Sequence, residues 1–144
     1  MQLKNTDPFV ERVTNRNKVK LELTYTELCF QLNGTASGVP FSGLIQEVVY
    51  DSRKINPSPG LVFFALTGPF RDGHNFISNA YEKGVRVFVV QKAPKNQWLD
   101  ASLILVDDAL LALQMLAGNY RKQLNYPILA IAGSLGKTTV KEWL

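Results

Sequence analysis

The stretch Leu61-Val62-Phe63-Phe64-Ala65-Leu66 is apolar at every position, and it is followed by a break at Gly68-Pro69. A strand in which polar and apolar residues do not alternate is typical of a sheet that is covered on both faces. We therefore expect residues 61–66 to form a central strand with helices packed on it.

Other strands are predicted on both sides of this one along the chain. Residues 46–50 (QEVVY) are predicted to form a strand that ends at the polar stretch 51–54, and the turn-forming residues 57–60 lead into the central strand. Residues 85–90 and 103–106, apolar except for Arg86, are predicted to form two more strands. Strands that alternate with helices at these spacings predict an α/β fold, a small sheet with flanking helices.

Three helices are predicted around these strands. The first lies before a loop rich in Gly, Ser and Pro, the second occupies residues 75–84, and the third is long and ends near residues 125–127. Polar side chains suited to capping precede the first and third helices, and glycines follow the first and second. The predicted caps and stops are Thr24 or Thr26, Gly34, Gly84, and Asp107 or Asp108.

Length and composition allow one domain and an appendage. The chain has 144 residues, 46% of them hydrophobic, which is enough for one core and too little for two full-sized domains. Residues 1–22 are polar and weakly periodic, so we expect a loose extension there. Residues 23–126 carry the predicted domain, in which Phe64 and Phe76 are expected core residues. Residues 127–144 begin a second unit.

The net charge of +4 does not indicate nucleic-acid binding. Counting Lys, Arg, Asp and Glu gives +2 for residues 1–22, −1 for residues 23–120 and +3 for residues 121–144, which sum to +4. A nucleic-acid-binding domain concentrates its basic residues on the folded body. Here the body is slightly acidic, so we expect no nucleic-acid partner.

Cys29 is the only cysteine and His74 the only histidine. One thiol cannot form an intrachain disulfide, and the pair cannot supply a Cys/His zinc cluster. We expect Cys29 to be a small buried side chain. No apolar run approaches the roughly 18 residues of a membrane span, and the first twenty residues lack the apolar stretch of a signal peptide. A cytoplasmic protein without a membrane partner is predicted.

A possible phosphate-binding loop lies near the end of the sequence. Residues 128–132 form an apolar strand, followed by a small-residue turn and the start of a helix. Glycines and a helix start offer backbone N–H donors to a polyphosphate. This predicts ATP binding by Gly133, Ser134, Gly136, Lys137, Thr138 and Thr139, with Mg²⁺ bound by the hydroxyl of Thr138.

The generic phosphate-loop pattern is incomplete, because Ile131 stands where its first glycine belongs. An ordinary strand-to-helix turn with a solvated Lys137 is the alternative interpretation.

Three stretches together resemble a known family. Residues 51–54 (DSRK), 61–68 (LVFFALTG) and 72–77 (DGHNFI) resemble, in order, the amino-terminal domain of the Mur ligases, which extend UDP-N-acetylmuramoyl peptides. The resemblance continues through the glycine loop and covers residues 24–144. Residues 140–144 resemble the MurF type, and with residues 63–66 they resemble MurF forms fused to an alanine racemase, although no racemase sequence is present.

The resemblance implies an ATP- and Mg²⁺-dependent ligase of peptidoglycan precursor synthesis that adds D-alanyl-D-alanine to UDP-N-acetylmuramoyl-tripeptide. The family's loop differs at three positions, where this chain has Ala130, Ala132 and Leu135. Because the sequence stops soon after Lys137, we expect these 144 residues alone to bind the UDP-linked substrate without catalysing the reaction.

The resemblance also implies a set of substrate-binding residues. A hydroxyl and a guanidinium at a strand end suit uracil or pyrophosphate oxygens, which points to Ser52 and Arg53. The full predicted set is Asp51, Ser52, Arg53, Ala65, Gly68, Asp72 and His74.

Alternatives remain open at this point. Arg53 is equally suited to a surface salt bridge with Asp51 or Asp72, and residues 72–74 to a helix cap beside a neutral histidine. The whole chain is also compatible with a fragment of a MurE-type ligase, a nucleoside triphosphate-binding regulatory module, or an interaction domain with a structural glycine loop.

Overall fold

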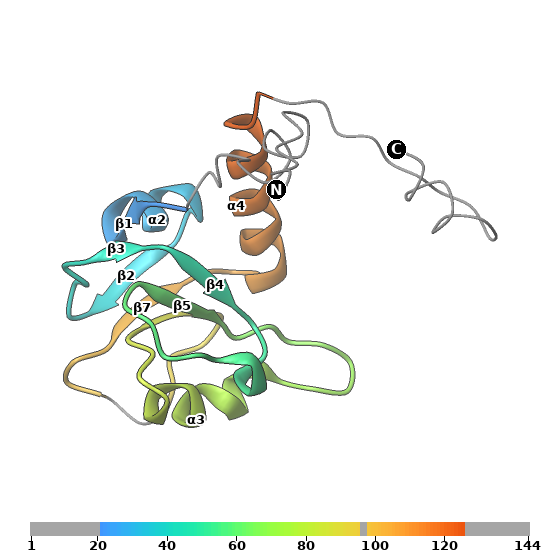
Figure 1. The fold of residues 1–144 in the computed structure, drawn as a ribbon. Coiled ribbons are helices and arrows are strands. Elements are labelled where there is room, and N and C mark those ends of the chain that lie inside the picture. The colour runs from blue at the N-terminus through green and yellow to red at the C-terminus, as the bar shows by residue number, and fades with distance from the viewer. Residues whose placement is uncertain (1–20, 96–97, 126–144) are drawn as a thin grey trace, which may run out of the picture.

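The computed structural model describes residues 21–95 and 98–125, which form a layered α/β domain (Figure 1). The α/β prediction is therefore confirmed. The predicted glycine loop and all but the last two residues of the predicted extension lie outside the described residues.

A five-stranded sheet with the order β2-β7-β6-β5-β4 forms the centre of the domain. Four of its strands are parallel, and β2 pairs antiparallel with β7 at one edge. A separate two-stranded antiparallel pair joins β1 to β3. The strands are β1 Leu23–Thr24, β2 Thr35–Gly38, β3 Leu44–Ile45, β4 Glu47–Val49, β5 Leu61–Phe64, β6 Val87–Val90 and β7 Ser102–Leu105.

Helices cover both faces of this sheet (Figure 1). Helices α2 (Tyr25–Gln31) and α4 (Ala109–Lys122) pack on one face, and α3 (Ile77–Glu82) packs on the other. Two short 3₁₀ helices, η1 (Ser52–Lys54) and η2 (Gly73–Phe76), follow strands β4 and β5.

Strand β5 shows why the central apolar run decides this architecture. Val62 and Phe64 point into the core beneath α2 and α4, whereas Leu61 and Phe63 point into the core beneath α3. All four side chains are buried, so each face of the strand contributes apolar surface to a separate core.

The helix caps explain where the helices start. Thr24 caps α2: its hydroxyl accepts from the Glu27 N–H, and the Glu27 carboxylate accepts from the Thr24 N–H. Asp108 caps α4, because its carboxylate accepts from the N–H groups of Leu110 and Leu111. Of the two alternatives at each helix, the structure selects Thr24 and Asp108.

Two helix ends differ from the sequence expectation. Asn33 (φ 49°), and not Gly34, takes the left-handed conformation after α2, and Gly34 donates to the Cys29 carbonyl as the next residue of the same motif. Helix α4 ends at Lys122, a few residues earlier than residues 125–127.

Three further expectations were wrong or only partly right. The predicted loop after α2 contains strand β2, which pairs with β7 although all four of its residues are exposed. Phe76 is 43% exposed and is not a core residue. Cys29 is only partly buried at the edge of a core.

Among the described residues, no helix has the length and apolar character needed to cross a membrane.

Candidate functional site

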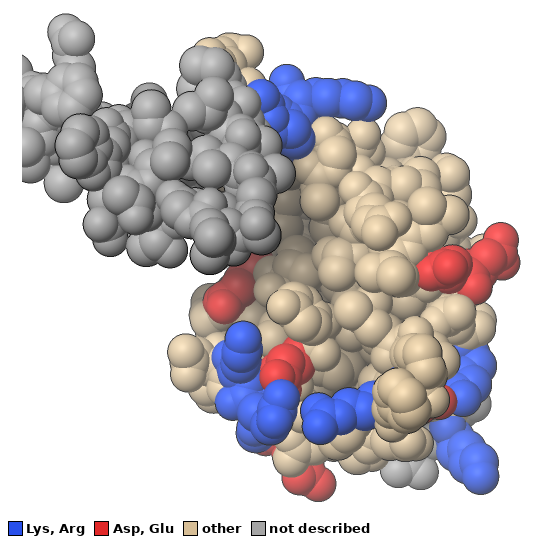
Figure 2. Space-filling view, turned by 90° about the vertical axis from the view of Figure 1, so that its right-hand side faces the viewer, with Lys and Arg blue, Asp and Glu red and all other residues tan. Residues whose placement is uncertain are grey.

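A cleft of about 800 Å³ lies at the carboxyl ends of β4 and β5. Ligand sites of open α/β sheets typically lie at this edge, and their volumes are roughly 300–1,000 Å³. Figure 2 looks onto this side of the domain and shows a hollow with basic and acidic side chains gathered below it. We call residues 50–54 the β4 wall and residues 66–73 the β5 wall.

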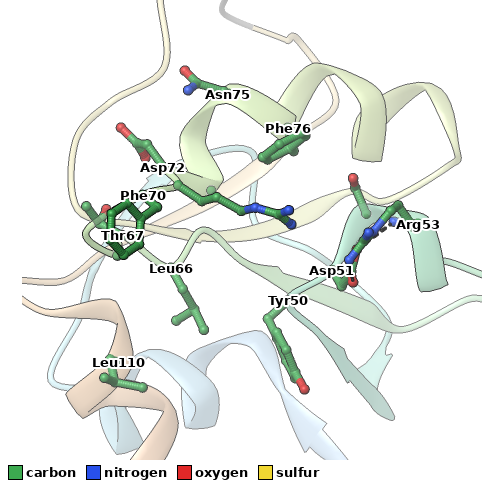
Figure 3. Close-up of a pocket in the computed structure, with 14 residues that line it drawn as sticks. Tyr50, Asp51, Arg53, Leu66, Thr67, Phe70, Asp72, Asn75, Phe76 and Leu110 are labelled. Carbon is green, nitrogen blue, oxygen red and sulfur yellow. Dashed lines mark hydrogen bonds and ion pairs between the residues drawn. The ribbon is translucent and has the colours of Figure 1, made fainter.

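The β4 wall is a tight turn whose polar groups are paired with one another. Asp51 caps η1 by accepting from the Arg53 N–H, and its two carboxylate oxygens also accept from Nε and Nη2 of Arg53 at 2.9 and 2.7 Å. These hydrogen bonds from Arg53 hold the pKa of Asp51 well below its usual range and raise the pKa of Arg53. Figure 3 shows Arg53 folded back onto Asp51 at one side of the cleft.

Lys83, the residue that follows α3, also holds this turn. Lys83 Nζ donates to the Ser52 main-chain oxygen at 2.6 Å. Ser52 is itself buried. The charge of the Lys83 ammonium strengthens this hydrogen bond, so Lys83 holds the first residue of η1 in place.

The β5 wall is a longer loop closed by main-chain bonds. The Gly68 N–H donates to the Arg71 carbonyl, and the Gly73 N–H donates to the Leu66 carbonyl, both at 2.8 Å. A Cβ at Gly73 would lie 2.6–2.8 Å from main-chain atoms of residues 65 and 66, so only glycine fits there. The loop carries Phe70 into solvent, with 97% of its surface exposed.

Asp72 anchors the far end of the β5 wall. Its carboxylate accepts from the His74 N–H at 2.9 Å and from Lys92 Nζ at 2.8 Å. The Lys92 and His74 bonds hold the pKa of Asp72 well below its usual range. This confirms the helix-cap interpretation of residues 72–74.

His74 lies behind the cleft, and its ring is fully engaged. Nδ1 is 2.6 Å from Asp72 Oδ1, and Nε2 accepts from the Gln91 N–H at 3.1 Å. An acceptor role for Nε2 assigns the ring proton to Nδ1. The side chain is 7% exposed, so the histidine joins the β5 wall to the end of β6 and offers no free nitrogen to a ligand.

The structure brings together five of the predicted substrate-binding residues and separates two. Asp51, Ser52, Arg53, Gly68 and Asp72 line the cleft. The other two do not line it: Ala65 is completely buried in the core, and His74 lies behind the wall.

Several cleft residues were missed by the sequence reasoning. Tyr50, Phe70 and Phe76 are aromatic and exposed, and Arg71 stands beside Phe70 on the β5 wall. Figure 3 shows Tyr50 and Phe76 on opposite sides of the cleft and Phe70 on a third side. An aromatic next to an arginine after a Gly-Pro break is the one signal that could have identified part of this set.

No ATP or metal site is assigned within residues 21–95 and 98–125. That part of the chain contains no group of three or more His, Cys, Asp or Glu residues that could hold a metal ion. The residues predicted to bind ATP and Mg²⁺, Gly133 to Thr139, lie outside it.

Comparison with known proteins gives consistent matches. A family model described as "Mur ligase family, catalytic domain" matches residues 44–121. The UDP-N-acetylmuramoyl-tripeptide--D-alanyl-D-alanine ligase of Buchnera aphidicola is 40% identical over 122 residues, which are 85% of this chain and 25% of that protein. The UDP-N-acetylmuramoyl-L-alanyl-D-glutamate--2,6-diaminopimelate ligase of Clostridium tetani is 36% identical over 99 residues, 66% of this chain and 20% of that protein.

A solved structure supports the same assignment. The UDP-N-acetylmuramoylalanyl-D-glutamyl-2,6-diaminopimelate--D-alanyl-D-alanyl ligase from Acinetobacter baumannii is 32% identical, with a TM-score of 0.68 over 87% of this chain and 28% of that one. The chain therefore spans about a quarter of the length of the relatives it matches. Because the family model covers more than half of the sequence and includes every residue that lines the cleft, this chain belongs to the Mur ligase family.

Proposed function

We propose that this chain is the substrate-binding, amino-terminal part of a MurF-type ligase. The complete enzyme adds D-alanyl-D-alanine to UDP-N-acetylmuramoyl-tripeptide in peptidoglycan precursor synthesis, and it thereby serves cell wall biogenesis, cell shape and cell division. Residues 23–126 form the domain that holds the UDP end of this substrate. A cytoplasmic location remains a prediction from composition.

The cleft between the β4 and β5 walls is the observation that carries this proposal. It combines exposed aromatic side chains with arginines at the carboxyl ends of parallel strands. A UDP-linked sugar presents a flat base and a diphosphate, which such groups bind by stacking and by charge-assisted hydrogen bonds. The matches to ligases named for UDP-N-acetylmuramoyl substrates agree with this chemistry.

The proposal also includes binding of ATP and Mg²⁺ by residues outside the cleft. Gly133, Gly136 and Lys137 would bind the phosphates of ATP, and Thr138 would bind Mg²⁺. In the complete ligase, phosphoryl transfer would activate the peptide carboxylate for attack by the amine of D-alanyl-D-alanine.

A MurE-type specificity is the second candidate, because the Clostridium tetani relative carries that name. Proteins of the two names act on different UDP-linked peptides. The Buchnera relative, with the higher identity, is named for the tripeptide and favours the MurF type.

Titration calorimetry of the 144-residue chain with UDP-N-acetylmuramoyl-tripeptide tests the proposal. We expect saturable binding of this ligand and of UDP, and a rise in the unfolding midpoint in their presence, because a ligand of the folded state stabilises it. Binding of UDP-N-acetylmuramoyl-dipeptide in clear preference to the tripeptide would favour the MurE type. A folded chain that binds neither peptide nor UDP at millimolar concentration would refute the proposed function.

A further inference from the structure

The two arginines that line the cleft are in different electrostatic states. The guanidinium of Arg53 makes two hydrogen bonds to Asp51, which neutralises much of its charge. Within the described residues, the Arg71 side chain makes no hydrogen bond or ion pair, although its main-chain carbonyl closes the loop with Gly68. The Arg53 guanidinium is therefore already paired, whereas the Arg71 guanidinium is available to bind an anion.

The nearest acidic residue in the sequence does not compete for Arg71. Asp72 follows it directly, but the Asp72 carboxylate is occupied by Lys92 Nζ and by the N–H and ring nitrogen of His74. The Asp51 carboxylate is likewise occupied by Arg53. Both carboxylates that line the cleft are satisfied, so neither needs to pair with Arg71.

The main chain of the β5 wall gives Arg71 a defined place. Its carbonyl accepts from the Gly68 N–H at 2.8 Å, and the neighbouring pair of residues 67 and 72 bridges the two sides of the loop. A planar guanidinium on a closed loop can donate two parallel hydrogen bonds to one phosphate group. Phe70, beside it, adds an exposed ring to the same opening.

We propose that Arg71 is the residue that binds the diphosphate of the nucleoside-diphosphate-linked substrate in this cleft, while the Asp51–Arg53 pair shapes the β4 wall without binding the anion. This inference rests on the proposed function and deepens it. It assigns the anion contact to an arginine that the sequence motif did not indicate.

Calorimetric titration of the 144-residue chain with UDP, and with uridine as a ligand without phosphate, tests this assignment in Arg71→Gln and in the matched control Arg53→Gln. Loss of a bidentate, charge-assisted contact should weaken UDP binding about tenfold or more in Arg71→Gln. Uridine binding should stay unchanged in that variant. Arg53→Gln should weaken UDP binding less than about threefold, because its partner is Asp51.

Each outcome bears on a different statement. UDP affinity equal to wild type in Arg71→Gln, or a larger loss in Arg53→Gln than in Arg71→Gln, would overturn the assignment while leaving the proposed function intact. An equal loss for UDP and uridine in Arg71→Gln would show a stacking or structural role and would also overturn it. A wild-type chain that binds no UDP would refute both proposals together.

Discussion

The β4 wall and the β5 wall face the same cleft, but they use their polar groups in opposite ways. In the β4 wall, Asp51 and Arg53 pair with each other and the main chain is held by Lys83. In the β5 wall, the base is anchored through Asp72, while Phe70 and Arg71 near the loop's tip have no polar partner on their side chains among the described residues. The polar groups of the first wall are paired with one another, and the second is the wall that we propose to contact the ligand.

If Arg71 binds the diphosphate as proposed, a recognisable motif marks a scaffold while its less distinctive neighbour makes the ligand contact. Residues 51–54 are prominent in the sequence because they build a capped turn at a strand end. The Asp51 cap and its pair with Arg53 are present in that turn without a ligand. Substitutions in the two walls can separate the two roles.

Gly73→Ala should remove the anchor of the β5 wall. Its new Cβ would lie 2.6 Å from the Leu66 nitrogen and 2.7 Å from the Leu66 oxygen, and main-chain atoms cannot rotate away as a side chain can. Overpacking of this kind costs about 2–3 kcal/mol of unfolding free energy. Urea denaturation monitored by circular dichroism measures the loss.

Gly68→Ala is the matched control on the same loop, because its Cβ would meet only the Arg71 oxygen at 3.7 Å, an ordinary contact. We expect its unfolding free energy to stay within about 0.5 kcal/mol of wild type. Equal losses in the two variants would show that the loop is not closed at Gly73 in the way described.

Asp72→Ala should destabilise the domain by a smaller amount, about 1–2 kcal/mol, because the cap of η2 and the link to His74 are lost together. The bond to Lys92 contributes little to this sum, since Lys92 is largely exposed. Denaturation at neutral pH measures the difference between variant and wild type.

The pH dependence of that difference has a definite sign. The hydrogen bonds that the Asp72 carboxylate accepts, of which the bond from Lys92 has the largest effect, lower the pKa of Asp72 in the folded state below the ordinary value of 3.8. A depressed carboxyl pKa contributes stability above the unfolded-state pKa, and this stability is lost as pH falls toward the folded-state pKa. The gap between wild type and Asp72→Ala should therefore narrow below pH 3.8. A gap that widens in acid would contradict the assigned contacts.

The centre of the sheet could be predicted from sequence because strands β5 and β6 are buried on both faces. Val62 and Phe63 belong to separate cores, so the run that contains them has to be apolar throughout. Strand β2 gave no such signal, since Thr35–Gly38 is exposed and held by main-chain pairing with β7. Phe76 was misassigned to the core because helical spacing does not reveal which face of a short helix meets a cleft.

The site was harder to predict, because pairing is a property of three-dimensional arrangement. Ala65 directly follows β5 and so lies at the edge of the sheet that carries the cleft, but its side chain is completely buried in the core. The sequence left Arg53 open between a ligand contact and a salt bridge, and the structure shows the salt bridge. Nothing in the sequence indicates that the Arg71 side chain has no polar partner within residues 21–95 and 98–125, since that depends on Lys92 and His74 occupying Asp72.

Lys83→Met should loosen the β4 wall by removing the donor to the Ser52 carbonyl. Loss of one such hydrogen bond costs about 1 kcal/mol, and methionine keeps the apolar stem. Lys54→Met is the matched control, because Lys54 is exposed in the same 3₁₀ helix and its side chain acts on Asp51 through its charge without a hydrogen bond or ion pair within the described residues. If both substitutions shift the unfolding midpoint equally, Lys83 does not anchor this wall.

The smallest expected effect is a change in UDP affinity when Arg53 is released from Asp51 in a chain that lacks Arg71. Asp51→Asn keeps an oxygen to accept from the Arg53 N–H but removes the negative charge that holds its guanidinium. Added to Arg71→Gln, this change should leave Arg53 as an available cation in the same cleft. We expect the double variant to bind UDP about threefold more tightly than Arg71→Gln alone, the size of an exposed charge interaction.

Calorimetry at two salt concentrations checks this exchange, because a gain that comes from charge must shrink as salt rises. Asp51→Asn in the otherwise wild-type chain is the control and should also bind UDP slightly more tightly. If the double variant shows no gain, Arg53 cannot reach the anion even when it is released. The β4 wall would then be a scaffold by its geometry as well as by its pairing, and the difference between the two walls would lie in where their main chains place the arginines.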